Sequence, residues 1–210
     1  MTGERRASAL AAAMVDALRE RAGLSRPDVA EAFRSVPRHL FVPGASLTQA
    51  YTFDAVIPTH FDAHGMSISS SSAPNIMATM LEQLDVAPGM HVLEIGAGTG
   101  YNAGLLGHLV GSDGAVVSID LDAPIVAEAQ EHLRAAGIGN VRVQTGDGWL
   151  GAPDDAQFDR IIATVGVWEI SPHWVEQLRP GGVLVLPLWL RPGAQVSVAF
   201  VRDDTDLHSV

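Results

Sequence analysis

The sequence predicts an α/β protein in which a doubly wound, mostly parallel sheet follows an N-terminal helical extension. Two observations support this prediction. From residue 73 onward, segments with helical periodicity alternate with short runs of β-branched and apolar residues, as in successive β-α-β units. One of these runs, residues 92–95, leads directly into a loop with glycines at 96, 98 and 100, where the backbone can approach a ligand closely.

The expected elements follow one another with short connections. Helices are expected at residues 74–84, 102–110, 124–136 and 172–178, and strands at 91–95, 116–119, 141–144, 158–163, 183–186 and 195–200. The earlier part of the chain is irregular, with helices near 7–22 and 27–36 followed by helix-stopping prolines. We therefore expect an extension or lid over residues 1–72 and a main domain over 73–210. The sequence ends soon after strand-like residues, which suggests a C-terminally truncated fragment.

Composition limits the classes of function. The chain has no cysteine and no lysine, which excludes thiol nucleophiles, Schiff bases and the P-loop lysine. A net charge of -11 disfavours nucleic-acid binding, which depends on clustered cations. No apolar run approaches the roughly 18 residues of a membrane span. Arg5 and Arg6 precede an apolar run that mimics a signal sequence, but the charged residues that follow indicate a surface helix. We expect a soluble protein.

The glycine loop indicates the kind of cofactor. Position 101 is tyrosine, so the dinucleotide fingerprint, which ends in a third spaced glycine, is not met. This departure favours S-adenosylmethionine over NAD, because no pyrophosphate has to be neutralised. The acid Glu94, just before the loop, can face the ammonium of such a cofactor directly or through water. A tight turn without any ligand and an NAD-dependent oxidoreductase are the less favoured alternatives.

Two further strands end in acids. Asp120 follows the strand at 116–119, where a carboxylate can accept hydrogen bonds from both hydroxyls of a ribose. Asp147 stands between Gly146 and Gly148, so its carboxylate can bind an adenine amino group while the ring lies against the backbone. Each acid alone could be an ordinary helix cap or turn residue. A cofactor site is favoured because these features follow one another in a fixed order: an acid, the glycine loop, a second acid and Gly-Asp-Gly.

Several motifs together point to a family. They are VPRHLFVP at 36–43, SAP at 72–74, VLEIGAGTGY at 92–101, GDGW at 146–149, FDRIIAT at 158–164 and GGVLVLP at 181–187. With them the chain resembles the protein-L-isoaspartate O-methyltransferases, a Rossmann-like branch of the class I S-adenosylmethionine-dependent methyltransferases. The resemblance implies a cytoplasmic enzyme that methylates the carboxylate of an isoaspartyl residue in a protein or peptide. The ester then collapses to a succinimide that can reopen as aspartate, which repairs the protein.

The resemblance and the motifs predict the site residues. Cofactor contacts are expected at Ile68, Ser69, Ser70, Ser71, Met77, Glu94, Gly96, Ala97, Gly98, Thr99, Gly100, Asp120, Leu121, Asp147 and Gly148. The serine of the family motif falls on Ser72. An acceptor carboxylate with a pKa near 4 is already ionised at pH 7, so its attack needs alignment and removal of water rather than a base. We expect the Ser72 hydroxyl and free N-terminal amides of the next helix to orient it. Helix capping alone is the alternative for Ser72.

The chain departs from the family pattern near the expected acceptor. Residues 64–68 and the four serines that follow are more polar than the family's glycine-threonine-isoleucine region. Trp168 places a large aromatic side chain in a loop expected to contact the acceptor, although it could instead pack near Trp174. His64 could also contact the acceptor. His60 and His64 have a metal-compatible spacing, but no third ligand is apparent and no metal is expected.

These departures leave two alternatives open. The pattern resembles a divergent branch associated with ribosomally made peptides, in which an aspartate of a constrained precursor is methylated and becomes aspartimide or isoaspartate. An alternative of another class is a module that binds S-adenosylmethionine without catalysis, because a fold does not fix a function. The sequence gives neither the acceptor's identity nor the oligomeric state.

Overall fold

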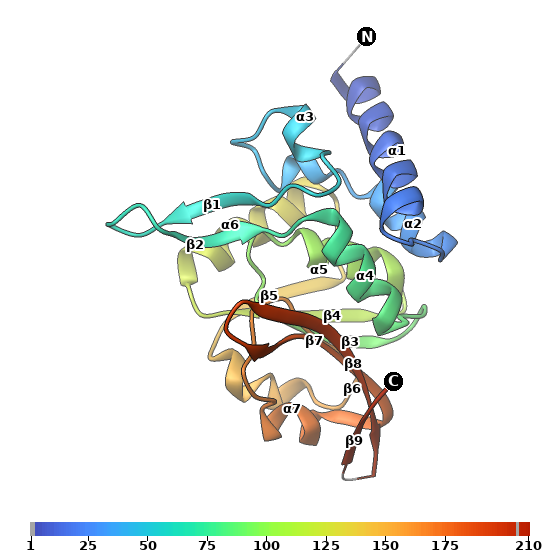
Figure 1. The fold of residues 1–210 in the computed structure, drawn as a ribbon, viewed down its shortest axis with the longest axis vertical. Coiled ribbons are helices and arrows are strands. Elements are labelled where there is room, and N and C mark those ends of the chain that lie inside the picture. The colour runs from blue at the N-terminus through green and yellow to red at the C-terminus, as the bar shows by residue number, and fades with distance from the viewer. Residues whose placement is uncertain (1–2, 205) are drawn as a thin grey trace.

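A seven-stranded sheet forms the centre of the molecule (Figure 1). The computed structural model describes residues 3–204 and 206–210. The strand order is β5-β4-β3-β6-β7-β8-β9, with β3 to β7 parallel and β8 and β9 antiparallel. The strands are β3 (His91–Ile95), β4 (Ala115–Asp120), β5 (Val141–Thr145), β6 (Phe158–Ala163), β7 (Leu178–Arg191), β8 (Ala194–Asp203) and β9 (Asp206–Ser209). The prediction of a doubly wound, mostly parallel sheet is confirmed.

The order in which the chain adds strands to the sheet reverses between β3 and β6. The chain runs outward from β3 through β4 to β5 and then returns to β6, which pairs with the other side of β3. In such sheets the crevice at the carboxyl ends of the strands at this switch point is the usual place for a ligand. The fold therefore directs attention to the loops after β3, β4 and β6.

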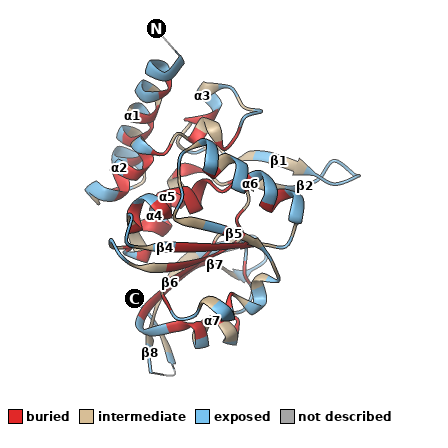
Figure 2. Ribbon diagram, turned by 180° about the vertical axis from the view of Figure 1, so that it is seen from behind, coloured by how far each residue is buried: buried red, intermediate tan, exposed pale blue. Residues whose placement is uncertain are grey.

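Helices cover both faces of the sheet. They are α1 (Gly3–Arg21), α2 (Pro27–Ser35), α3 (Leu47–Ala50), α4 (Pro74–Leu84), α5 (Tyr101–Val110), α6 (Ala123–Ala135) and α7 (Pro172–Gln177), with short 3-10 helices η1 (Arg38–Leu40), η2 (Gly148–Leu150) and η3 (Pro153–Asp155). Alternate residues of the strands face opposite sides, so Val92 packs toward α4 and α5 whereas Leu93 packs toward α7. Figure 2 shows the buried residues concentrated in the central strands and on the inner sides of the helices.

The N-terminal helices share the main core. The two helices expected near residues 7–22 and 27–36 are confirmed as α1 and α2, and Leu18 and Phe33 on them belong to the same buried cluster as Leu81 of α4. The division of the chain at residue 72 stays a prediction, because this core runs across it. None of the helices in the described part of the chain has the length and apolar content of a membrane span.

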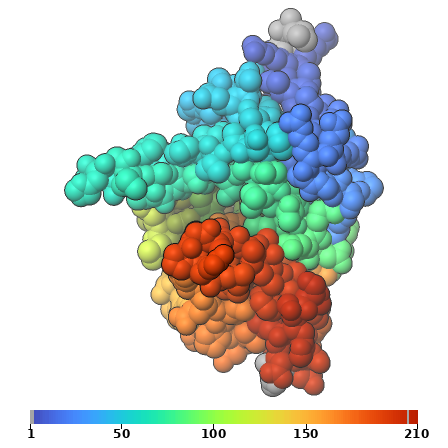
Figure 3. All heavy atoms as spheres, in the orientation of Figure 1, coloured from blue at the N-terminus to red at the C-terminus, as the bar shows by residue number. Residues whose placement is uncertain are grey.

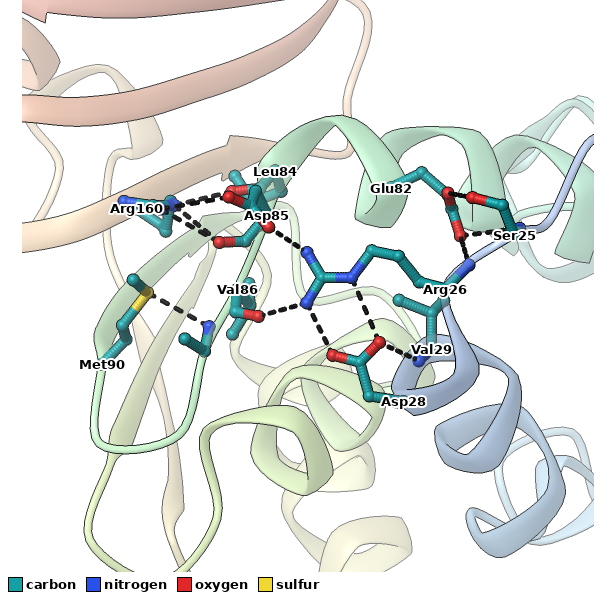
Figure 4. A network of polar contacts seen from close by, with 11 residues as sticks. Ser25, Arg26, Asp28, Val29, Glu82, Leu84, Asp85, Val86, Met90 and Arg160 are labelled. Carbon is teal, nitrogen blue, oxygen red and sulfur yellow. Dashed lines mark hydrogen bonds and ion pairs between the residues drawn. The ribbon is translucent and has the colours of Figure 1, made fainter.

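A polar network ties α2 to the end of α4 (Figure 4). Arg26, at the start of α2, forms ion pairs with Asp28 and Asp85 and donates to the carbonyl of Val86 at 2.6 Å. Asp85 ends α4 in the left-handed conformation with φ 51°. Arg160 of β6 donates from Nε to the carbonyl of Leu84 at 2.6 Å. The network fixes α4, whose other end borders the switch-point crevice.

A β-hairpin missing from the sequence prediction projects from the body of the molecule (Figures 1 and 3). Its strands β1 (Ile57–Phe61) and β2 (Ser67–Ser71) form a separate antiparallel sheet. This segment carries no strand signal because β2 is mostly serine and lacks the apolar alternation of a half-buried strand. Phe61 and Ile68 are 57% and 58% exposed, whereas Ser71 at the base of the hairpin is buried.

The C-terminal strands are longer than the sequence indicates. A strand is predicted at 183–186, but β7 runs from Leu178 to Arg191 and pairs with β8 as a long antiparallel ribbon. Pro180 and the glycines at 181 and 182 favour a turn in sequence terms, which hid the first part of β7. The helix predicted at 172–178 ends at Gln177, because Leu178 already belongs to β7. Strand β9 was not predicted.

Candidate functional site

A cleft of about 220 Å³ opens at the switch point, at the carboxyl ends of β3, β4 and β6. Its walls come from the glycine loop after β3, the end of β4, the residues after β6, and the segment that joins β2 to α4. The base of the hairpin and the strand ends of the sheet thus both form walls of the crevice. This is the place where the topology favours a ligand.

Most of the predicted cofactor contacts line this cleft. They are Ile68, Ser69, Ser70, Ser71, Met77, Gly96, Ala97, Gly98, Thr99 and Asp120, together with the predicted acceptor-orienting residue Ser72. Sequence reasoning missed five lining residues: Tyr101, Asn102, Ile125, Thr164 and Val165. Of these, Thr164 and Val165 directly follow β6, so the rule that ligands lie at strand tips could have found them.

The glycine loop comes closer to the neighbouring segments than a loop with side chains could. Gly96, Gly98 and Gly100 have φ values of 95°, 50° and 82°, which side chains rarely adopt. A Cβ at Gly96 would lie 2.6 Å from Cγ1 of Val165, and one at Gly98 would lie 3.3 Å from the carbonyl oxygen of Ser70. Gly100 instead packs against Ala129 of α6. The first two glycines thus let the loop pass close to residues 165 and 70 in the walls of the cleft, and the third lets α5 pack against α6.

Asp120 is oriented by the same loop. The backbone N–H of Gly98 donates to Oδ2 of Asp120 at 2.9 Å. This bond holds the carboxylate at the end of β4, where it lines the cleft and is partly exposed. Its remaining lone pairs can accept the hydroxyls of a ribose, so the geometry fits the predicted role.

Glu94 lies behind the cleft rather than in its wall. It is fully buried, and it accepts hydrogen bonds from Nδ2 of Asn102 at 2.8 Å and from Oγ of Ser118 at 2.5 Å. Burial raises the pKa of Glu94 to about 7. Asn102 lines the cleft, and its Oδ1 is buried without a partner. An ammonium group in the cleft would therefore reach Glu94 through Asn102, and direct contact with Glu94 stays a prediction.

The remaining predicted cofactor residues lie beside the cleft. Asp147 caps η2 by accepting from the backbone N–H of Trp149 at 2.9 Å. Gly148 lines a neighbouring cleft, and Leu121 is 77% exposed next to Asp120. Contacts of these three residues with an adenine ring stay predictions.

The neighbouring cleft is lined by aromatic side chains. This tryptophan cleft has a volume of about 330 Å³ and shares Val165 with the main cleft. Trp149, Trp168 and Trp174 line it. Trp168 is 62% exposed and stacks on Trp189, with ring centroids 5.5 Å apart. Trp174 pairs with Trp149 at 6.4 Å, so the stacking partner of Trp168 is Trp189 rather than Trp174.

Ser72 is available for a ligand. The structure places the N-cap of α4 at Ala73, without a side-chain hydrogen bond, so the alternative that Ser72 is only a helix cap is wrong. The carbonyl oxygen of Ser72 accepts from Nη2 of Arg38 at 2.8 Å, and the residue is partly exposed in the cleft wall. The expectation of free amides at the start of α4 is also wrong. The N–H of Asn75 donates to the carbonyl of Phe53 at 2.9 Å, and that of Ile76 to Ala73 at 3.1 Å.

The two histidines of the hairpin lie apart from the main cleft. His64 is exposed in the turn between β1 and β2 and lines neither the main cleft nor the tryptophan cleft. Nε2 of His60 lies 3.3 Å from Oε1 of Glu128 on α6. Within the described residues, no group of three or more acidic or histidine side chains could hold a metal ion. A role for His64 in acceptor binding stays a prediction.

Comparisons with known proteins identify the family of this chain. The sequence model of the protein-L-isoaspartate(D-aspartate) O-methyltransferase family matches residues 9–210. The chain is 37% identical to a protein-L-isoaspartate O-methyltransferase of Thermotoga maritima over 163 residues, which are 78% of this chain and 51% of the relative. It is also 37% identical to the enzyme of that name from Ignicoccus hospitalis, over 85% of this chain and 82% of the relative.

Solved structures show the same similarity. A protein-L-isoaspartate O-methyltransferase superposes with a TM-score of 0.84 at 35% identity, covering 93% of this chain and 61% of the other. A Plasmodium falciparum protein solved with S-adenosyl-L-homocysteine superposes with a TM-score of 0.79 at 17% identity, covering 94% and 92%, which shows the shared fold. The chain spans about half the length of the Thermotoga relative and most of the Ignicoccus one. It belongs to the protein-L-isoaspartate(D-aspartate) O-methyltransferase family.

Proposed function

We propose that this protein is an S-adenosylmethionine-dependent methyltransferase that acts on the carboxylate of an L-isoaspartyl residue in a protein or peptide. The observation that carries this proposal is the position of Ser72, which lines the same cleft as the glycine loop and Asp120 in a chain of this family. The backbone nitrogen of the following residue in the acceptor would then attack the ester carbonyl and release methanol, which closes a succinimide without further help from the protein. That step makes the reaction one of repair.

The residues of the cleft fit the cofactor's parts. Asp120 would accept the ribose hydroxyls, the backbone at Gly96 and Gly98 would pass close to the ligand, and Oδ1 of Asn102 would accept its ammonium group. When bound, the cofactor supplies an electrophilic methyl group on a sulfonium. Methyl transfer to a carboxylate forms a C–O bond, breaks a C–S bond and releases no proton. The absence of a His-Asp pair from the cleft lining is thus no obstacle.

Ser72 would orient the acceptor. Its hydroxyl can donate to one oxygen of the acceptor carboxylate, which leaves the other oxygen to attack. Arg38 fixes the backbone here through the Ser72 carbonyl. The first amides of α4 already have hydrogen-bond partners and cannot donate to the acceptor. The Ser72 hydroxyl would therefore be the main donor to the acceptor carboxylate at this end of α4. The positioning effect should therefore depend strongly on this one hydroxyl.

The acceptor would extend from the main cleft over the tryptophan cleft. The two share Val165, and the exposed face of Trp168 lies beside them. A polypeptide that carries the reacting carboxylate can place a neighbouring apolar or aromatic side chain there. The net charge of -11 continues to disfavour nucleic acid as a partner. We place this reaction in the cytoplasm, the compartment expected for an enzyme of this family that repairs cellular proteins.

A second candidate acceptor is an ordinary aspartate in a constrained peptide precursor. Two departures from the family pattern favour it: the polar segment from residue 64 to 72, which belongs to the projecting hairpin with exposed Phe61 and Ile68, and Trp168 in the loop after β6. Both add contact surface near the cleft, as binding of a particular peptide would require. The reaction class and the cofactor site are the same for both candidates.

One experiment separates the candidates. The protein is incubated with cofactor carrying a labelled methyl group and with two peptides of identical sequence, one with L-isoaspartate and one with L-aspartate. Base-labile label on the isoaspartyl peptide alone supports repair, and label on a constrained aspartyl peptide supports biosynthesis. Cofactor binding without transfer to either peptide would favour the non-catalytic module. Ser72→Ala is the matched variant, because it should lose transfer and keep cofactor binding.

A further inference from the structure

We propose that Arg38, with the hydroxyls of Ser71 and Tyr101, forms a recess that binds the α-carboxylate of the cofactor. The proposal rests on the proposed function in one respect, namely that the ligand of the main cleft is an S-adenosyl amino acid. It adds a positively charged subsite that neither the motifs nor the lining of the cleft assigns. The name Arg38 recess is used below for these three residues.

Arg38 is a buried cation without a counterion. Its side chain is 0% exposed, and it takes part in none of the ion pairs found among the described residues. Nη2 donates to the carbonyl oxygen of Ser72, but Nε and Nη1 have no partner. Burying a guanidinium with unpaired donors is strongly unfavourable unless an anion or a polar ligand completes it. The free donors therefore indicate a missing partner.

Two neighbouring hydroxyls share this condition. Oγ of Ser71 and the phenol oxygen of Tyr101 are buried and have no hydrogen-bond partner. Both residues line the main cleft, and the guanidinium carbon of Arg38 lies 4.7 Å from the centre of the Tyr101 ring. Burial raises the pKa of Tyr101 above its ordinary value, so its hydroxyl stays a neutral donor. Guanidinium and hydroxyl groups are the donors that bind carboxylates well.

The charges of the cleft favour the cofactor as the source of this carboxylate. The residues that line the main cleft include Asp120 and no arginine or histidine, and the chain has no lysine. Asn102, whose free Oδ1 suits an ammonium group, directly follows Tyr101. An acceptor for ammonium and donors for carboxylate thus belong to one cleft and the recess behind it, which matches the two charged groups of an α-amino acid. Pairing the acceptor's carboxylate with Arg38 would instead weaken it as a nucleophile.

The test measures discrimination between two ligands rather than turnover. Calorimetry compares S-adenosylhomocysteine with S-adenosyl-3-thiopropylamine, the same molecule without its α-carboxylate. The wild-type protein should prefer S-adenosylhomocysteine, and Arg38→Met should lower its affinity for that ligand by about 10- to 100-fold. Affinity for the amine should change little. Arg38→Lys should restore part of the preference.

A matched control separates charge from structure. Arg160 is also largely buried, with 11% of its side chain exposed, and donates to the carbonyl oxygens of Leu84 and Asp85 at the opposite end of α4 from the cleft. Arg160→Met should leave the preference between the two ligands intact. An equal loss for both ligands in Arg38→Met, or an unchanged preference, would overturn the proposal. If circular dichroism shows that Arg38→Met does not fold, Tyr101→Phe and Ser71→Ala decide in the same way.

The outcomes also distinguish this proposal from the proposed function. A wild-type protein that binds S-adenosylhomocysteine with the expected preference but methylates no peptide would refute the acceptor and leave the Arg38 recess standing. Loss of acceptor affinity in Arg38→Met with unchanged ligand discrimination would assign the recess to the acceptor's carboxylate and refute our choice. Binding of neither ligand to the wild type would refute both.

Discussion

Replacement of Glu94 by glutamine should stabilise the folded protein at and above neutral pH. Glu94 is fully buried, and its two carboxylate oxygens accept from Asn102 and Ser118. Glutamine has nearly the same shape, keeps one acceptor for Asn102 and can donate to the Ser118 oxygen. The variant therefore removes a buried charge and leaves the packing in place.

The magnitude follows from the pKa of Glu94. Burial raises it from 4.5 to about 7, so the folded protein holds this proton more tightly than the unfolded chain does. The stabilising contribution of the protonated group is complete below pH 4.5 and is lost as the pH rises through about 7. At about 1.4 kcal/mol per pH unit, this range corresponds to about 3 kcal/mol of unfolding free energy. Glu94→Gln should avoid that loss.

Urea unfolding at fixed pH values between 5 and 8.5, followed by circular dichroism, tests this expectation. The difference in unfolding free energy between Glu94→Gln and wild type should be smallest at pH 5 and approach about 3 kcal/mol above pH 8. Glu131→Gln, on the exposed side of α6, is the matched control for loss of one carboxylate. A difference that stays constant across the range would show that the environment of Glu94 does not raise its pKa.

Further predictions concern the residues around the cleft. Ser72→Ala should slow methyl transfer by about tenfold or more and leave cofactor affinity unchanged, as measured by steady-state kinetics and calorimetry; an unchanged rate would remove Ser72 from the mechanism. Asp120→Asn should weaken cofactor binding by about tenfold, and equal binding would place the ribose elsewhere. Trp168→Ala should raise the KM for peptide by about 5- to 30-fold without changing the cofactor Kd, and an effect on Kd alone would contradict an acceptor role. Arg26→Ala should cost about 1 to 2 kcal/mol in urea unfolding by cutting the link between α2 and α4, and loss of activity at full stability would be unexpected.

The central strands could be predicted because their local and tertiary requirements agree. The strands at 91–95 and 158–163 and the helix at 74–84 have the predicted bounds. Buried parallel strands need apolar residues on both faces, and that pattern is visible without knowledge of their partners. Elements that depend on a distant partner gave no such signal. The serine-rich strand β2 needs β1, and the first part of β7 pairs with β6 despite its proline and glycines.

The candidate site divides in the same way. Glycines, Asp120 and the serine segment were predictable because strand ends and turns show in the sequence. The roles of Asn102 and Arg38 were not, because each depends on contacts between residues that the fold brings together. Asn102 screens Glu94 from the cleft, and Arg38 reaches the carbonyl of Ser72, 34 positions away. Hydrogen-bond satisfaction of buried groups has no signature in a single sequence.

The buried polar groups of the site also predict how the cofactor acts on stability. Glu94 holds a proton that it would release more easily with an ammonium group bonded to Asn102. Arg38 has hydrogen-bond donors without partners. A zwitterionic ligand would complete both groups at once. Its affinity should therefore rise as the pH increases through about 7, because ionised Glu94 favours the ammonium. In Glu94→Gln this pH dependence should disappear. A wild-type affinity that falls over the same pH interval would mean that the ligand's ammonium does not interact with the Asn102–Glu94 pair.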